Sequence, residues 1–227
     1  MGDIQPFRVM DLLARAGELE AAGRDIVHME VGEPDFPTPA PVAAAAKAAI
    51  DAGHTRYTPA VGLPALREAI AGHYAARYGV AVDPARIVVT PGASGALQLL
   101  MGVLVDPGDR VLLPDPGYPC NRHFVRLFEG EGTLVPVDGG SDYQLTPAHL
   151  AEHWDERTVA AMVGSPSNPT GTVATTEELQ GLTEAVASRG GRLIVDEIYH
   201  GLVYGGDAPS ALSTTEDAFV VNSFSKF

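Results

Sequence analysis

Short apolar runs alternate with helix-forming segments through most of this sequence, and this alternation constrains the fold more than any other feature. The runs are almost continuously apolar, a pattern typical of strands that are covered on both faces. Strands that alternate with helices favour a largely parallel sheet between two helical layers, so we predict an α/β fold. The predicted strands are Ile87–Val89, Val111–Leu113, Thr133–Val137, Val159–Val163, Leu193–Val195 and Phe219–Val221.

Three predicted helices connect strands of this alternating part. They end near Leu104, Gly130 and Gly190. The last of them opens with Thr175 and Glu178, whose spacing of three residues is the pattern of a capping box.

The segment before residue 87 is expected to be mainly helical. Apolar spacing predicts helices at about 9–22 and 64–78, and an Ala-rich helix with Pro41 near its first turn lies between them. His28–Val31 is predicted as a short strand. Gly32–Pro39 is too rich in turn residues for regular structure.

The composition indicates a globular protein with a sizeable core and excludes several functions. Of the 227 residues, 45% are hydrophobic and 19% are charged. The net charge of −14 repels phosphate backbones, so nucleic acid is not an expected partner. The sequence has no apolar run of about 18 residues and no secretory signal, which argues against a membrane. The single cysteine, Cys120, excludes an internal disulfide and favours a cytoplasmic location.

The segments with unusual composition all follow the carboxyl end of a predicted strand. They contain Gly92, Ala93 and Ser94, then Tyr118, Asn168, Asp196 to Tyr199, and Ser223 to Lys226. In open parallel sheets, ligands bind outside the carboxyl ends of the strands. These residues are therefore expected along one rim of the sheet.

Lys226 and Asp196 each have an ordinary and a chemical interpretation. A single lysine is usually a solvated surface charge, and an aspartate after a strand is usually a solvated or capping group. A lysine held at the rim with little water can instead lose its proton and attack a carbonyl group. Asp196 could in the same way pair with a cationic ring nitrogen.

The polar and aromatic residues of the loops are equally open to two interpretations. "NPTG" is most often only a turn, although the amide of Asn168 could donate to a ring oxygen. Tyr118 and Tyr199 could be packing aromatics or could stack on and hydrogen-bond to a ligand.

The stretch "TPGASGAL" could bind an anion or be only a tight turn. Gly92 and Gly95 allow backbone N–H groups to approach an anion at a helix N-terminus, and Ser94 adds a hydroxyl. It matches neither the P-loop nor the dinucleotide-binding pattern. The seven histidines show no metal-ligand spacing, so we predict no metal, and Cys120 is interpreted as a small filler residue.

Together these residues describe a pocket for pyridoxal 5'-phosphate: an anion cradle, a stacking ring, an amide, an aspartate and an imine-forming lysine. The sequence also resembles the class I/II pyridoxal-phosphate aminotransferases of fold type I along essentially its whole length. The resemblance rests on "VGEPDFPTP", "RYTPAVGLPALREAI", "TPGASGAL", "PDPGYP", "SPSNPTG", "VDEIYHGL" and "SFSK".

The resemblance implies a catalytic role for three residues. Lys226 would form the imine with the cofactor aldehyde and move the substrate proton. Asp196 would keep the pyridine nitrogen protonated, and Tyr199 would hydrogen-bond the ring hydroxyl oxygen. Asn168 would bond the same oxygen and border the substrate, and Tyr118 would stack on the ring.

The resemblance also implies how the phosphate and a partner are bound. Gly92, Ala93, Ser94 and Ser223 would hold the phosphate. Tyr57 would reach the phosphate of a neighbouring subunit, which implies a homodimer with shared active sites. Gly32 would line the substrate side, and the substrates would be an α-amino acid and a 2-oxo acid.

The family's pattern continues past its lysine, whereas this sequence ends at Phe227. The resemblance implies a mostly parallel mixed sheet that lacks the strand beside the lysine strand, and a small domain without its C-terminal part. Residues 1–40 would be an N-terminal arm with part of the small domain, and residues 41–227 an incomplete cofactor-binding domain. We therefore expect this chain alone to be an incomplete transaminase.

The same residues are also compatible with other functions. A carbon–sulfur lyase, a cyclopropane-forming synthase or a decarboxylase of this fold could use the same residues. A non-catalytic regulatory domain that binds the cofactor is a further alternative. The acidic charge disfavours the DNA-binding module that such a regulator needs.

Overall fold

The computed structural model describes residues 2, 4, 6–32 and 36–226. Its centre is a five-stranded sheet in the order β2-β1-β3-β4-β5, and every neighbouring pair is parallel. The prediction of an α/β fold with a parallel sheet is therefore confirmed. The strands are β1 (Arg110–Asp115), β2 (Glu131–Pro136), β3 (Thr158–Gly164), β4 (Arg192–Asp196) and β5 (Phe219–Val221).

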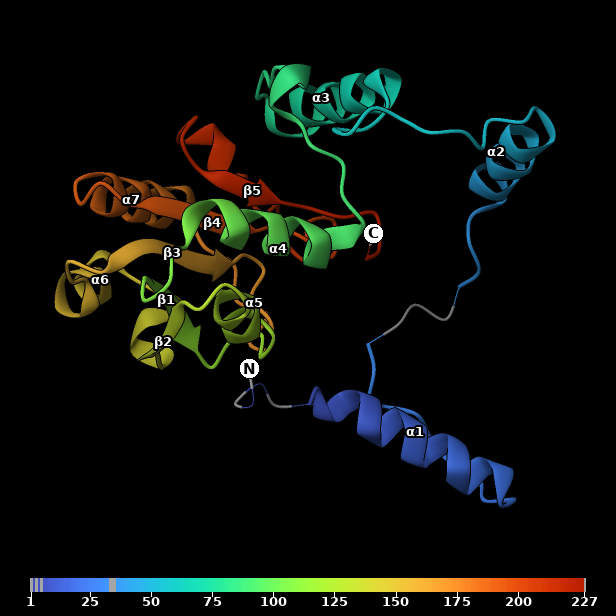
Figure 1. The fold of residues 1–227 in the computed structure, drawn as a ribbon, viewed down its shortest axis with the longest axis horizontal. Helices are drawn as coiled ribbons and strands as arrows, with labels where there is room; N and C mark the ends of the chain where they lie inside the picture. Colours follow the sequence, from blue (N-terminus) through green and yellow to red (C-terminus); the bar gives the residue numbers. More distant parts are fainter. Residues whose placement is uncertain (1, 3, 5, 33–35, 227) are drawn as a thin grey trace.

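Helices cover both faces of this sheet (Figure 1). On one face α4 (Gly92–Leu104) and α5 (Asn121–Leu127) enclose a core around Met101, Val111 and Met162. On the other face α6 (Pro147–His153) and α7 (Thr176–Ala187) enclose a core around Leu112, Val163 and Leu182. Alternate residues of β1, β3, β4 and β5 enter different cores, which is why these strands are continuous apolar runs in the sequence.

Local signals explain where several helices begin and end. α7 begins with the expected capping box, since Thr175 accepts from the N–H of Glu178 and Glu178 accepts from the N–H of Thr175. The short helix α6 was not predicted; Thr146 and His149 form its capping box. The 3₁₀ helices are η1 (Pro84–Arg86), η2 (Gly139–Ser141) and η3 (Ala211–Ser213).

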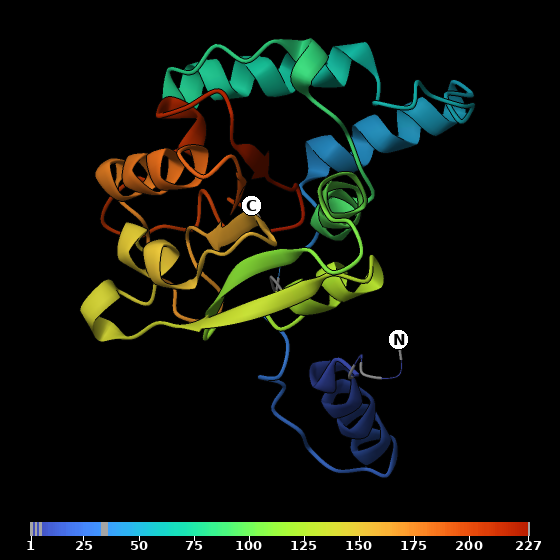
Figure 2. The ribbon, with the colours of Figure 1, turned by 60° about the vertical axis from the view of Figure 1, so that its left-hand side comes forward.

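The three N-terminal helices lie outside the layered core. They are α1 (Arg8–Ala21), α2 (Ala40–Asp51) and α3 (Pro64–Tyr78), and all three were predicted. α1 and α2 bury no residue, and in Figures 1 and 2 they lie apart from the sheet. None of the described helices combines the length and the apolar character that crossing a bilayer requires.

Two predicted strands are wrong. His28–Val31 is irregular, with Met29 88% exposed, and Ile87–Val89 is extended but belongs to no sheet, with Val88 54% exposed. Both segments are rich in apolar residues, but a strand also needs a hydrogen-bonded neighbour. Among the described residues, only a single backbone bond, from Val89 N to Val61 O, links the second segment to a distant part of the chain. The resemblance implies a sheet without the strand beside the one that leads to Lys226. That strand is β5, and it is an edge of the described sheet.

The close approach of Gly191 to Trp154 provides a stability prediction. A Cβ at Gly191, just before β4, would lie 2.3 Å from Cη2 of Trp154 and 3.1 Å from the carbonyl oxygen of Val159. We expect Gly191→Ala to lower the free energy of unfolding by about 1–3 kcal/mol, because the packed ring cannot move away freely. Denaturant unfolding should show this loss, whereas Gly72→Ala on α3, where a Cβ meets nothing within 4 Å, should leave stability equal or higher. Equal stability of wild type and Gly191→Ala would contradict the packing at Trp154.

Candidate active site

The carboxyl ends of the parallel strands meet at one rim, which carries most of the expected site residues. In the sheet register, Asp196 at the end of β4 lies between Gly164 of β3 and Val221 of β5. Tyr118, Asn168 and the segment up to Lys226 follow β1, β3 and β5 respectively. Four of the five expected loops therefore follow strands of the sheet at one rim, whereas the loop with Gly92 to Ser94 follows a segment that belongs to no sheet among the described residues.

Asp196 is a carboxyl group with little access to water. Its Oδ1 accepts a hydrogen bond from the backbone N–H of Ile198 at 3.0 Å. Burial raises the pKa of Asp196 from 3.8 to about 6, against the lowering effect of that N–H. A cation placed against this carboxyl group would reverse the shift, so the side chain is suited to hold a protonated ring nitrogen.

Asn168 and Tyr199 come together from neighbouring loops. Asn168 Nδ2 donates to Tyr199 Oη at 3.2 Å, and both side chains are half-buried. An amide N–H and a phenol O–H that meet in this way can both donate to one further oxygen. Their contact fits the expectation that both bind the same ring oxygen.

Tyr118 lies close to the same group of side chains. Burial raises its pKa, and a hydrogen bond with Cys120 and the charges of Tyr199 and Asp196 raise it further. The half-buried Cys120 also packs against the α4–α5 core, which agrees with its interpretation as a filler. The ring of Tyr118 contacts the edge of Phe7, with 6.1 Å between the ring centroids.

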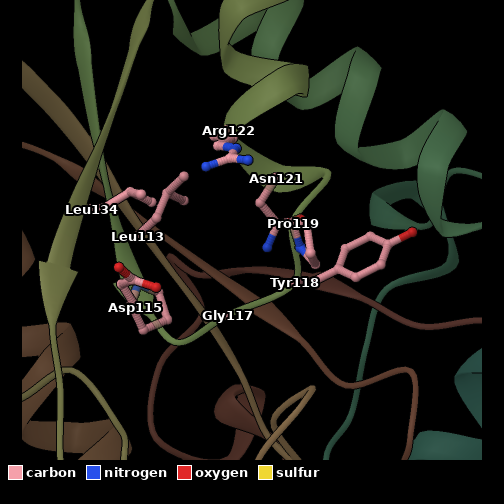
Figure 3. A pocket seen from close by; sticks show the side chains of 9 residues that line it. Leu113, Asp115, Gly117, Tyr118, Pro119, Asn121, Arg122 and Leu134 are labelled. Atoms are coloured by element: carbon pink, nitrogen blue, oxygen red, sulfur yellow. The ribbon is translucent and has the colours of Figure 1, made fainter. Parts of the chain in front are cut away.

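A small cavity of about 140 Å³ lies on the other side of the loop that carries Tyr118 (Figure 3). Its lining includes Leu113, Leu134 and Arg122, and the ring of Tyr118 points away from these side chains. Of the candidate residues only Tyr118 lines it. The candidate site is therefore the open rim of the sheet and not this cavity.

The expected phosphate cradle lies at the first turn of α4. Gly92 has a φ of +72°, and it is exposed, whereas Ala93 at the same turn lies against the α4–α5 core. The first N–H groups of a helix have no partner within the helix, so they can receive an anion. α4 packs against β5, and in Figure 1 the C-terminal end of the chain lies beside the first turn of α4. Ser94 belongs to the same turn.

The segment after β5 carries Ser223 and Lys226. Ser223 Oγ donates to Ser225 Oγ at 2.9 Å and accepts from the backbone N–H of Ser225. Lys226 is half-buried. The two residues follow the strand that neighbours Asp196, so they belong to the same part of the rim.

Two candidate residues lie away from this rim. Tyr57 is fully exposed, on the link between α2 and α3, and Gly32 is exposed between α1 and α2. Residues 33–35 of the expected turn segment lie outside the described residues. The chain by itself therefore does not bring Tyr57 to the other residues that are expected to bind the phosphate.

Sequence reasoning missed three residues that hold the rim in place. Gln144 is 3% exposed, and its Nε2 donates to the carbonyl oxygens of Gly164 and Thr172 on either side of the Asn168 loop. Glu197 and His200, inside the "DEIYH" stretch, are also buried. Local sequence gives no signal that separates these two buried side chains from Asp196 and Tyr199 at the rim.

The raised pKa of Asp196 leads to a prediction for the cofactor-free protein. An acid whose pKa is higher in the folded state than in the unfolded chain stabilises the fold at low pH, and this contribution is lost as pH rises through the folded pKa. We expect the ionisation of Asp196 to lower the free energy of unfolding by about 2 kcal/mol as the pH rises from 4 to 6. His200, whose pKa burial lowers to about 4, acts in the opposite direction.

Denaturant unfolding at several pH values, compared between wild type and Asp196→Asn, isolates the Asp196 contribution. The stability of the variant minus that of wild type should grow from pH 4 to 6. A difference that stays constant over this range would show that the Asp196 carboxyl group is solvated.

The residues at the rim fit pyridoxal phosphate. Asp196 is half-buried with a raised pKa, which suits a cationic ring nitrogen, and the Asn168–Tyr199 pair suits a ring oxygen. Among the described residues, no group of three or more His, Cys, Asp or Glu side chains could hold a metal ion. The parallel sheet and the residues at its rim together identify the chain as an α/β domain of the class that binds pyridoxal phosphate.

The chain belongs to the aminotransferase class I and II family, whose sequence profile matches residues 24–227. A valine–pyruvate aminotransferase of Mycobacterium tuberculosis is 41% identical in a match that covers 99% of this chain and 58% of that protein. An aspartate aminotransferase of Geobacillus stearothermophilus is 39% identical over 91% of this chain and 52% of that protein.

Solved structures show the same fold. The aspartate aminotransferase of Thermus thermophilus with maleate has a TM-score of 0.93 at 34% identity, over 98% of this chain and 59% of that one. The chain thus spans a little more than half the length of the relatives that it matches. The cofactor that this family membership assigns is pyridoxal phosphate.

Proposed function

We propose that the protein is a pyridoxal-phosphate-dependent aminotransferase that moves an amino group from an α-amino acid to a 2-oxo acid. The observation that carries the proposal is the desolvated Asp196 beside the Asn168–Tyr199 pair at the rim, one strand away from the segment with Lys226. Family membership supports the same activity. The substrates stay open, because one relative is named for valine and pyruvate and another for aspartate.

Each residue of the rim then has a physical task. When bound, the cofactor supplies an aldehyde and an electron-withdrawing ring that accepts the electrons of a broken α-carbon bond. Asp196 keeps the ring nitrogen protonated, since an ionised carboxylate beside a desolvated cation stabilises it. Asn168 and Tyr199 would hold the ring oxygen, and Tyr118 would pack against the ring. The Lys226 amine would bind the aldehyde at rest and would carry the proton from the substrate α-carbon.

Phosphate binding and assembly belong to the same proposal. Gly92, Ala93, Ser94 and Ser223 would hold the phosphate at the start of α4. The fully exposed Tyr57 would complete the site of a second subunit in a homodimer, and its exposure in the single chain supports this. Gly32 and Asn168 would border the substrate. Residues 1–40 would act as an arm with part of a small domain, residues 41–227 would form the cofactor-binding domain, and the enzyme would work in the cytoplasm.

Incubation of the protein with pyridoxal phosphate, single amino acids and either pyruvate or 2-oxoglutarate tests the proposed activity. We expect one oxo acid and one new amino acid to appear in equal amounts. Release of ammonia, sulfide or carbon dioxide without the paired amino acid would instead identify a lyase or a decarboxylase. The experiment uses the full-length protein, and full-length protein that takes up the cofactor but converts no amino acid would overturn the proposal.

A further inference from the structure

The turn after β4 directs its side chains to two different sides. Asp196 and Tyr199 belong to the rim described above, whereas Glu197 and His200 enter the interior, with exposed fractions of 0% and 5%. A buried carboxyl group is costly unless hydrogen bonds compensate it. A leucine would fill the same space without this cost, so the contacts of Glu197 need an explanation.

Glu197 ties the turn to two other segments. Its Oε1 accepts from Ser210 Oγ at 3.1 Å and from the backbone N–H of Ala211 at 2.7 Å. Its own backbone N–H donates to the carbonyl oxygen of Val221 at 2.8 Å. One residue thus connects the end of β4 both to η3 and to the strand that leads to Lys226.

His200 extends this connection to α3. Its Nδ1 lies 2.8 Å from Tyr78 Oη and 3.6 Å from Glu197 Oε2, and its backbone N–H donates to the carbonyl oxygen of Glu197. Within the described part of the chain Glu197 Oε2 makes no hydrogen bond, so Oε1 carries the side-chain hydrogen bonds of this residue. Burial and the charge of Asp196 raise the pKa of Glu197 to about 7, so a neutral side chain is tolerated at this position.

We propose that Glu197 is a positioning residue that fixes the turn between Asp196 and Tyr199, and through them the orientation of the bound ring. Asp196 and Tyr199 lie on either side of the anchored residue, so a shift of its backbone moves both groups. The anchor depends on acceptance by Oε1 and not on charge. The inference rests on the proposed function, because it concerns the pyridoxal phosphate bound by those two groups.

Comparison of Glu197→Gln with Glu197→Ala tests whether the side chain acts through its hydrogen bonds or through its charge. Glutamine can accept from Ser210 and Ala211 in the same geometry, whereas alanine cannot. We expect Glu197→Ala to weaken pyridoxal phosphate binding about tenfold or more, and Glu197→Gln by about threefold at most. The visible circular dichroism of the bound cofactor should shrink in Glu197→Ala alone, and kcat should fall more than KM rises.

Gly191→Ala is the matched control, because it disturbs the opposite end of the same strand. It should lower the melting temperature but leave cofactor affinity and the dichroic band unchanged. Should Glu197→Ala fail to fold, Ser210→Ala removes only one of the two donors and should weaken cofactor binding by about threefold. Wild-type affinity and dichroism in Glu197→Ala or Ser210→Ala, or equal losses in the glutamine and alanine variants, would overturn the proposal.

Hydrogen exchange without cofactor distinguishes failure of this inference from failure of the proposed function. The amides of residues 197–200 should exchange faster in Glu197→Ala than in wild type and Glu197→Gln. If wild type bound no pyridoxal phosphate, the proposed function would fail and the ring-orienting role with it. Exchange at these amides that is the same in all three proteins would reject the anchor itself, whatever the cofactor result.

Discussion

Replacing Lys226 by alanine is expected to lower the rate of transamination by about four orders of magnitude. The amine at this position is proposed both to bind the cofactor aldehyde and to carry the proton from the substrate, and alanine can do neither. The rate of oxo acid formation measures the loss. Cofactor binding should persist in weaker form, because Asp196, Tyr118 and the start of α4 stay in place.

The sequence contains only one other lysine, Lys47, which provides a matched control. Lys47 is exposed on α2 and away from the rim, so Lys47→Ala should keep wild-type activity. Borohydride reduction of the holo protein followed by peptide mass mapping should add the cofactor mass to Lys226 and leave Lys47 unmodified. A modified Lys47, or full activity in Lys226→Ala, would remove the basis of the proposed function.

Replacing Asp196 by asparagine should lower the rate by about two to three orders of magnitude, the usual cost of removing one group that stabilises developing charge. The amide has the same shape but cannot keep a ring nitrogen protonated. Asp196 is half-buried, and burial raises its pKa to about 6, so its interaction with a cation is stronger than it would be in water. Steady-state rates of the variant and of wild type, each saturated with cofactor, measure the effect.

Asp115 serves as the control for Asp196, since it ends β1 at the same rim but is exposed to solvent. Asp115→Asn should therefore change the rate by less than about threefold. Equal rates in Asp196→Asn and wild type would show that the carboxylate does not hold the ring nitrogen. A large loss in Asp115→Asn would indicate that general disturbance of the rim, and not a specific charge, explains both results.

The site could be predicted in part because Tyr118, Asn168, Asp196 and Lys226 each lie at or after the carboxyl end of a strand. Asn168 and Tyr199 are 31 residues apart, yet parallel strands bring both loops to the same rim, where they form a hydrogen bond. The sequence contains no comparable rule for Glu197. Its neighbour Asp196 has the same charge, and only the packed structure shows that one carboxyl group belongs to the rim and the other enters the interior.

The strands at 28–31 and 87–89 were predicted wrongly for a related reason. Local sequence reports whether a segment is apolar and suited to extension, whereas a strand exists only if a neighbour completes its hydrogen bonds. The same kind of apolar run at Leu193–Val195 was predicted correctly, because β3 lies on one side of it and β5 on the other.

The sequence by itself determined the α/β class, the family, and which loops follow the carboxyl ends of most strands. Apolar periodicity and short motifs are local properties, so they can be recognised without the structure. Only the tertiary structure decided which segments pair, which acidic group is desolvated, and how Glu197 is anchored. Strand pairing and burial depend on contacts between residues far apart in the chain, and the free energy of those contacts cannot be read from one segment alone.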